Sequence, residues 1–223
     1  MADTARERII DAAERLFAQR GITAVSLREI SAAANQRNTS AVQYHFGSKH
    51  RLIEAIHVCR LQAINERRLA LFAELERDGR AANLRSLVEA MVYPVAESLQ
   101  AGTCYARFAA QTLTDPIHSR ILSFRLGAQD GMHQINTRVV ALSRGIPSSL
   151  CSQRLFFAAR LWLQALAEHE RELETGQPSM PTAALAAELV DLVVGMISAP
   201  VSPAVQRSVQ QRAREAASPR RCH

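Results

Sequence analysis

The sequence predicts an all-α protein. The chain of 223 residues is 48% apolar and 22% charged, which is ordinary for a globular protein with a packed core. Aromatic residues make up only 5% of it, while alanine and leucine, which favour helix over sheet, are abundant. Glycine and proline are few, and they stand at the edges of segments whose apolar residues recur at helical spacing. We therefore expect helices separated by short breaks.

Two capping boxes mark the first two predicted helices. Thr4 and Glu7 form the first box, because each side chain can satisfy a backbone N–H at the start of a helix. This helix is expected to end at Gly21, a residue that readily takes a positive φ. Ser26 and Glu29 form the second box, which opens a short helix.

A third, short helix is predicted between Asn35 and Phe46. Asn35 can end the preceding helix in a left-handed conformation. The stretch after it is polar at its start, and Val42 and Phe46 are its only strong apolar anchors. The remaining residues of this helix are therefore expected to face solvent.

Longer helices are predicted for the rest of the chain. Ser48 caps a fourth helix that runs to about Asp78. Further helices are expected at 83–101, 103–113, 117–143, 150–174 and 182–198. Gly127 and Gly131 should weaken the third of these, and from Pro200 onward we expect disorder, or at most a frayed helix over 204–216.

The net charge of +6 is unevenly distributed. It is +3 over residues 1–60, −1 over residues 61–199 and +4 over residues 200–223. A basic head on a neutral body suits binding to nucleic acid. A soluble enzyme with a basic tail would show the same distribution, so charge alone does not decide the function.

The cysteines and the apolar runs indicate no metal site, cofactor or membrane span. Cys59, Cys104, Cys151 and Cys222 lack metal-ligand spacing and are expected to be small buried residues. The start of the chain lacks the apolar stretch of a signal peptide, and no apolar run approaches the ~20 residues of a membrane helix. We therefore expect a cytoplasmic protein.

The first three predicted helices have the lengths and order of a helix-turn-helix module, in which the last helix enters the major groove of DNA. The residues themselves resemble the TetR family. The resemblance rests on Val-Ser-Leu-Arg-Glu-Ile at 25–30 and Val-Gln-Tyr-His-Phe-Gly-Ser-Lys at 42–49, and it covers about residues 6–56. Between Asn35 and Phe46 the chain is one residue longer than the common family pattern, so the register of this turn on DNA stays open.

The resemblance implies a domain layout and a set of partners. Residues 1–50 would be the helix-turn-helix domain, residues 51–199 a helical ligand-binding and dimerisation domain, and residues 200–223 a basic, disordered tail. The implied partners are a double-stranded DNA operator, a small-molecule effector and a second copy of the chain. The helices 150–174 and 182–198 would form the dimer interface, since apolar residues cover nearly every face of the second one. A central helix buried within a monomer is the alternative.

The family pattern also implies which residues contact DNA. Ser40, Ala41, Gln43 and Tyr44 would face the groove, while His45 and Lys49 would face phosphate groups. The full predicted set is Ser26, Arg37, Asn38, Thr39, Ser40, Ala41, Gln43, Tyr44, His45 and Lys49. Three residues also have structural interpretations: Ser26 as a helix cap, Tyr44 packed against the first helix, and His45 as a hydrogen-bonded structural residue.

Candidate ligand contacts combine apolar bulk with a few polar groups, as small-molecule pockets do. They are Tyr93, Cys104, Arg107, Phe108, Met132, His133 and Trp162. Arg107 lies between Tyr105 and Phe108 and needs an acidic partner if it is buried. Glu97 or an acidic or acyl ligand could supply that partner.

These inferences predict a DNA-binding transcriptional regulator, in its simplest form a repressor released by a small molecule. An activator of the same fold and a helical adaptor that has lost DNA binding are the alternatives. A helical enzyme is a rival of another class, but the sequence contains no nucleophile, metal or phosphate-loop signature. We therefore expect no enzymatic activity.

Overall fold

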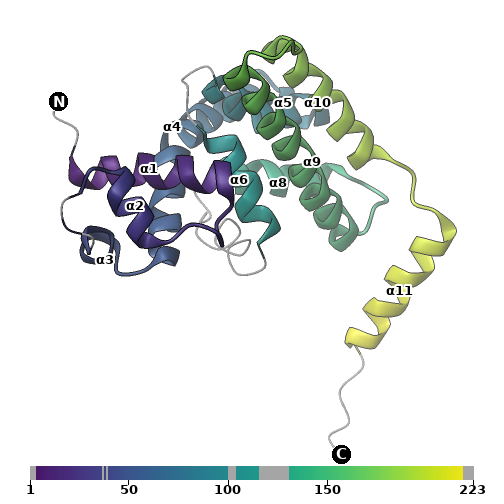
Figure 1. Ribbon diagram of the computed structural model, residues 1–223. Coiled ribbons are helices and arrows are strands. Elements are labelled where there is room, and N and C mark those ends of the chain that lie inside the picture. Colours follow the sequence, from purple (N-terminus) through teal and green to yellow (C-terminus); the bar gives the residue numbers. More distant parts are fainter. Residues whose placement is uncertain (1–3, 37, 39, 100–103, 116–130, 218–223) are drawn as a thin grey trace, which may run out of the picture.

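The predicted helices are present throughout the part of the chain that the structure describes. The computed structural model describes residues 4–36, 38, 40–99, 104–115 and 131–217, and these residues form helices and no strands. Figure 1 shows α1, α2 and α3 grouped at one end, with α4 leading from them into the remaining helices. The bounds are α1 Ala5–Arg20, α2 Leu27–Ala33, α3 Ala41–Phe46, α4 Lys49–Arg77, α5 Leu84–Leu99, α6 Tyr105–Thr114, α8 Gly131–Leu142, α9 Ser148–Thr175, α10 Thr182–Ser198 and α11 Pro203–Ala217, with a 3-10 turn at Arg80–Ala82.

Local signals set most of these bounds. Both capping boxes form with reciprocal side-chain and backbone bonds, and the hydroxyl of Ser48 accepts from the backbone N–H of Arg51 at the start of α4. Gly21 and Asn35 follow α1 and α2 with φ values of 83° and 52°. The predicted ends of these helices are thus confirmed.

Two predicted segments have a different outcome. The helix expected over 117–143 is present as α8 from Gly131, while residues 116–130, including Gly127, lie outside the described residues. The tail, for which we expected disorder or at most a frayed helix, contains α11, which projects away from the other helices (Figure 1).

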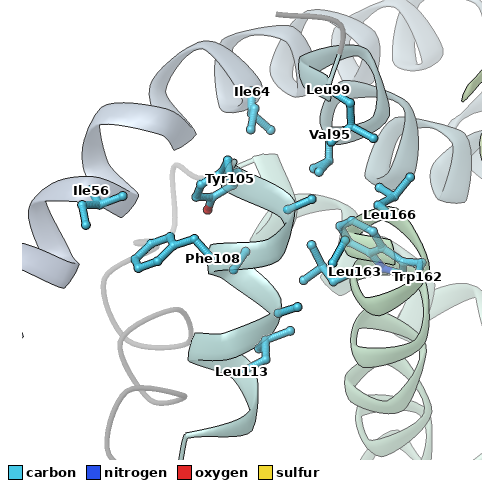
Figure 2. Packing of buried hydrophobic residues seen from close by; sticks show 14 of the residues in the cluster. Ile56, Ile64, Val95, Leu99, Tyr105, Phe108, Leu113, Trp162, Leu163 and Leu166 are labelled. Carbon is cyan, nitrogen blue, oxygen red and sulfur yellow. The ribbon is translucent and has the colours of Figure 1, made fainter. Parts of the chain in front are cut away.

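α6 is the central connecting helix. It packs against α9 on one side and α1 on the other, while α4 packs against α5 and α8, and α10 against α5 and α9. Figure 2 shows Tyr105 and Phe108 of α6 on the side toward Ile56 of α4, with Trp162 and Leu163 of α9 beyond α6. α6 thus lies between the N-terminal helices and the rest of the body.

Close packing joins α8 to α4. The backbone N–H of Gly131 donates to Asn65 Oδ1 over 2.8 Å. A Cβ at this glycine would lie 3.0 Å from Cγ of Arg68, so a larger residue here would require the Arg68 side chain to shift.

No single described helix is long and apolar enough to span a membrane, although α10 and the first part of α11, bent by 66°, pass that test as a pair by length and composition alone.

Candidate nucleic-acid interface

α2 is held at its first turn by the hydrogen bonds of Ser26. Its hydroxyl accepts from the backbone N–H of Glu29 at 3.2 Å and donates to the Glu29 carboxylate at 2.7 Å. Glu29 in turn accepts from the backbone N–H of Ser26 and pairs with Arg20 at 2.8 Å. These bonds, the backbone bond first, lower the pKa of Glu29 to about 2. Ser26 is therefore a helix cap, and a phosphate contact by it stays a prediction.

α3 is a short helix with one face in the core and the other in solvent. Val42 and Phe46 are buried, as their spacing predicts, while Gln43, Tyr44 and His45 are exposed. Tyr44 is 85% exposed, and its ring meets that of the neighbouring His45 edge to face, at 5.2 Å between centroids. The alternative in which Tyr44 packs against the first helix is therefore wrong.

Ala41 departs from the expected outward position. It is 7% exposed, because it lies one residue before Val42 at the start of a six-residue helix and packs inward with it. Its methyl group is therefore part of the core and does not face outward. The expectation that Ala41 faces the DNA groove is therefore wrong.

The turn before α3 is closed by an asparagine side chain. Asn38 Oδ1 accepts from the backbone N–H of Ser40 at 2.8 Å, and the Asn38 carbonyl accepts from the N–H of Ala41. Asn38 and Ser40 are both exposed. Arg37 and Thr39 lie outside the described residues, so their DNA contacts stay predictions.

Lys49, a predicted phosphate contact, is held by other residues of the protein and does not extend freely into solvent. Its ammonium donates to the carbonyl of Val25 at 2.6 Å and lies 5.5 Å from the centroid of the Phe17 ring. It is half-buried, and this burial lowers its pKa. Lys49 therefore fastens the start of α4 to the segment that precedes α2.

A charged cluster attaches α1 to α4. Arg60 of α4 bonds to Glu14 at 2.6 Å and also to Asp11. Glu14 is 2% exposed, and burial raises its pKa while the Arg60 guanidinium opposes that rise. Sequence reasoning missed this cluster, although Glu14 falls within the inward-facing stripe of α1 between Ala13 and Phe17.

A cavity of about 550 Å³ lies among the helices of the body. Of the seven predicted ligand contacts, it is lined by Met132, His133 and Trp162. Its other walls are mainly apolar, with Arg68 and Tyr105 as buried polar contributors that the prediction did not include. Arg68 is spaced four residues from both Ile64 and Phe72, a position that should have indicated an inward side chain.

The other four candidates do not line this cavity. Phe108 is in the core and Tyr93 is half-buried. Arg107 donates to Glu170 at 3.1 Å and to Cys104 Sγ at 3.2 Å, and it also pairs with Glu174.

The expected partner of Arg107 is therefore corrected. Glu97 of α5 pairs with Arg67 at 3.1 Å. The acidic groups beside Arg107 come from α9 instead. Burial raises the pKa of Glu170, and its bonds to the N–H groups of Arg107 oppose the rise. No group of three or more His, Cys, Asp or Glu within the described ranges could hold a metal ion.

Large apolar side chains are exposed on α9 and α10. Phe156, Phe157 and Leu161 of α9 are 41%, 49% and 38% exposed, and Leu192 of α10 is 45% exposed. Arg160 covers part of the Phe156 ring, with its guanidinium carbon 5.0 Å from the centroid. These side chains lie on the two helices that the sequence predicts for a dimer contact.

Comparison with known proteins identifies the N-terminal part of the chain. Residues 9–56 match the family model described as bacterial regulatory proteins, tetR family. No curated protein matches the chain. The matched range covers α1 from residue 9, all of α2 and α3, and the first part of α4, and it includes the capping box at Ser26 and the contacts of Lys49. The chain therefore carries the DNA-binding domain of the tetR family of bacterial regulatory proteins and is a DNA-binding transcriptional regulator.

Proposed function

We propose that the protein is a homodimeric, cytoplasmic repressor that leaves its operator when a small molecule occupies the cavity. The observation that carries the DNA-binding half of this proposal is the outer face of α3. Gln43, Tyr44 and His45 stand exposed on a helix that Val42 and Phe46 hold in place. A glutamine can pair with adenine and a tyrosine hydroxyl can donate to a phosphate or a base edge, so this face suits the major groove.

The exposed apolar residues of α9 and α10 support a second copy of the chain as partner. The two helices pack against each other and present Phe157, Leu161 and Leu192 to solvent. Two such pairs related by a two-fold axis would form a four-helix contact and cover these side chains. A dimer would also place two copies of α3 on successive turns of one DNA face.

The cavity supports response to a small molecule. About 550 Å³ is within the range of small-molecule sites, and the walls combine apolar residues with a few polar groups. A ligand that binds better to one separation of the two α3 helices would shift the dimer toward that separation. DNA would then be released, because half-sites one helical turn apart accept only one spacing.

Selection from a random duplex library tests this function. The expected result is enrichment of a two-fold symmetric sequence by the wild-type chain and no enrichment by a variant that carries both Gln43→Ala and Tyr44→Ala. Both side chains are exposed, so the variant should fold normally and serve as a matched control. Failure of the wild-type chain to enrich any symmetric sequence would favour an adaptor that has lost DNA binding.

A second step separates repression from activation and tests ligand release. The enriched duplex is placed at a promoter for transcription in vitro, where a repressor lowers transcript yield and an activator raises it. Repeating the selection with a panel of small molecules tests release, because an effector should reduce the enrichment.

A further inference from the structure

α6 lines the cavity and also contacts aromatic side chains of α1 and α4. Tyr105, Ala109 and Leu113, spaced four residues apart, line the cavity. Phe108, one turn after Tyr105, lies on the side toward α4 and α1: its ring centroid lies 4.8 Å from that of His57 and 6.1 Å from that of Phe17. A displacement of α6 at the cavity would therefore move Phe108 against Phe17 of α1 and His57 of α4.

A buried hydrogen bond ties the cavity wall to α4. The hydroxyl of Tyr105 and Nδ1 of His57 share a hydrogen bond of 3.0 Å, and the two rings meet edge to face at 5.8 Å. Tyr105 is 2% exposed and His57 is 3% exposed. A hydrogen bond in such surroundings is stronger and more sensitive to geometry than one in water. Tyr105 thus lines the cavity and is bonded to α4 through its hydroxyl.

The same contacts continue to Lys49. The Phe17 ring stacks on that of Phe108, and the Lys49 ammonium lies 5.5 Å from the centroid of Phe17. Lys49 then donates to the carbonyl of Val25, just before α2. We call this contact of Lys49 with Phe17 and Val25 the lysine latch. It fixes the start of α4 relative to α2, the helix that supports the DNA-facing α3.

We propose that Tyr105 and His57 are the pair through which occupancy of the cavity reaches the lysine latch. A molecule in the cavity presses on the Tyr105 ring and strains its bond to His57. Phe108 and Phe17 shift with these residues, and the latch loosens. This inference rests on the proposed function, because it names how the same cavity would regulate DNA binding.

The chain offers a readout that needs no DNA. Lys49 is the only lysine in the sequence. An ammonium that donates to a carbonyl and lies against a ring is shielded from acylating reagents. The rate at which sulfosuccinimidyl acetate modifies Lys49, followed by peptide mass spectrometry with the chain's α-amino group as internal reference, therefore measures opening of the latch.

A substitution can stand in for the occupant. Ala159 lies on α9 in the opposite wall of the cavity and is half-buried, so Ala159→Phe fills space without altering α6. Tyr105→Phe removes only the hydroxyl that bonds to His57. Tyr93→Phe is the matched control, since it removes a hydroxyl from a half-buried tyrosine that does not line the cavity.

A double-mutant cycle then decides the proposal. Ala159→Phe should speed acylation of Lys49 by roughly fivefold in the wild-type and Tyr93→Phe backgrounds, and by less than about twofold in the Tyr105→Phe background. The milder Ala159→Leu replaces Ala159→Phe if the melting curve shows that the phenylalanine prevents folding. Equal effects in all three backgrounds, or no effect in the wild type, would overturn the coupling.

The same proteins, tested on the selected duplex, distinguish this inference from the proposed function. If the latch responds through Tyr105 but no duplex is ever enriched, the proposed function fails and the coupling stands. If a duplex binds normally and the latch ignores Ala159→Phe, the coupling fails and DNA recognition stands.

Discussion

The charged cluster between α1 and α4 allows a quantitative test of how the DNA-binding unit is held together. Arg60→Met removes the guanidinium that bonds to Glu14 and Asp11 and keeps most of the aliphatic bulk. Asp11 can turn to water, since its side chain is 43% exposed. Glu14 cannot, because only 2% of its side chain is exposed.

The expected cost follows from that burial. Removing one partner of a buried ion pair destabilises a protein by about 3–5 kcal/mol, because the other charge is left uncompensated. Arg60 is itself 25% exposed, so we expect a loss near the lower end, about 3 kcal/mol. That is a large part of the about 5–15 kcal/mol by which folded proteins are stable.

The loss should depend on pH. Burial already raises the pKa of Glu14 above its ordinary 4.5, and loss of Arg60 should raise it further. Between the unfolded and the folded pKa, the folded state holds a proton that the unfolded state releases, so stability falls as pH rises across that interval. The variant should therefore lose less stability at pH near 5 than at pH near 7.

Urea unfolding at the two pH values measures this effect, with Glu14→Gln as the matched second change. Gln removes the charge but keeps a side-chain oxygen and nearly the same shape. The double variant Arg60→Met with Glu14→Gln should recover at least half of the loss. The reasoning is refuted if Arg60→Met alone costs less than about 1 kcal/mol, or if the double variant is no more stable than the single one.

Four further outcomes are expected. Tyr44→Ala should leave the unfolding midpoint unchanged, since the side chain is 85% exposed, and weaken binding to the selected duplex by about tenfold in a gel shift. Lys49→Ala should weaken binding to all duplexes alike and reduce the salt slope by about one, and unchanged affinity in both variants would remove this face as the DNA contact. Phe157→Ser should convert a dimer to a monomer in analytical ultracentrifugation, and an unaltered sedimentation profile would exclude this side chain from the interface. Ser26→Ala should cost about 1 kcal/mol in chemical unfolding, because the capping box with Glu29 is lost; no change would mean that other bonds hold α2.

Local sequence signals predicted the helices well because each depends on a few neighbouring residues. The boxes at Thr4 and Ser26 and the positive φ at Gly21 and Asn35 need no information about distant contacts. The rotation of a six-residue helix depends on packing, which explains why Ala41 lies in the core.

The site residues were harder to predict where distant segments meet. The bond from Lys49 to the Val25 carbonyl joins residues that only the folded backbone brings together. The cavity draws on several helices, so composition identified Met132, His133 and Trp162 but missed Tyr105 and Arg68. Similarly, only the packing of α9 against α6 reveals Glu170 as the partner of Arg107.

Trp162 can serve as an intrinsic fluorescence probe of the cavity. It is the only tryptophan in the chain, it is 4% exposed, and it lines the cavity. Indole emission depends on the polarity of its surroundings, so entry of a small molecule into the cavity should shift or quench the intrinsic fluorescence without any label. Compounds can therefore be screened on the unmodified protein and without DNA, with the signal coming from the cavity itself.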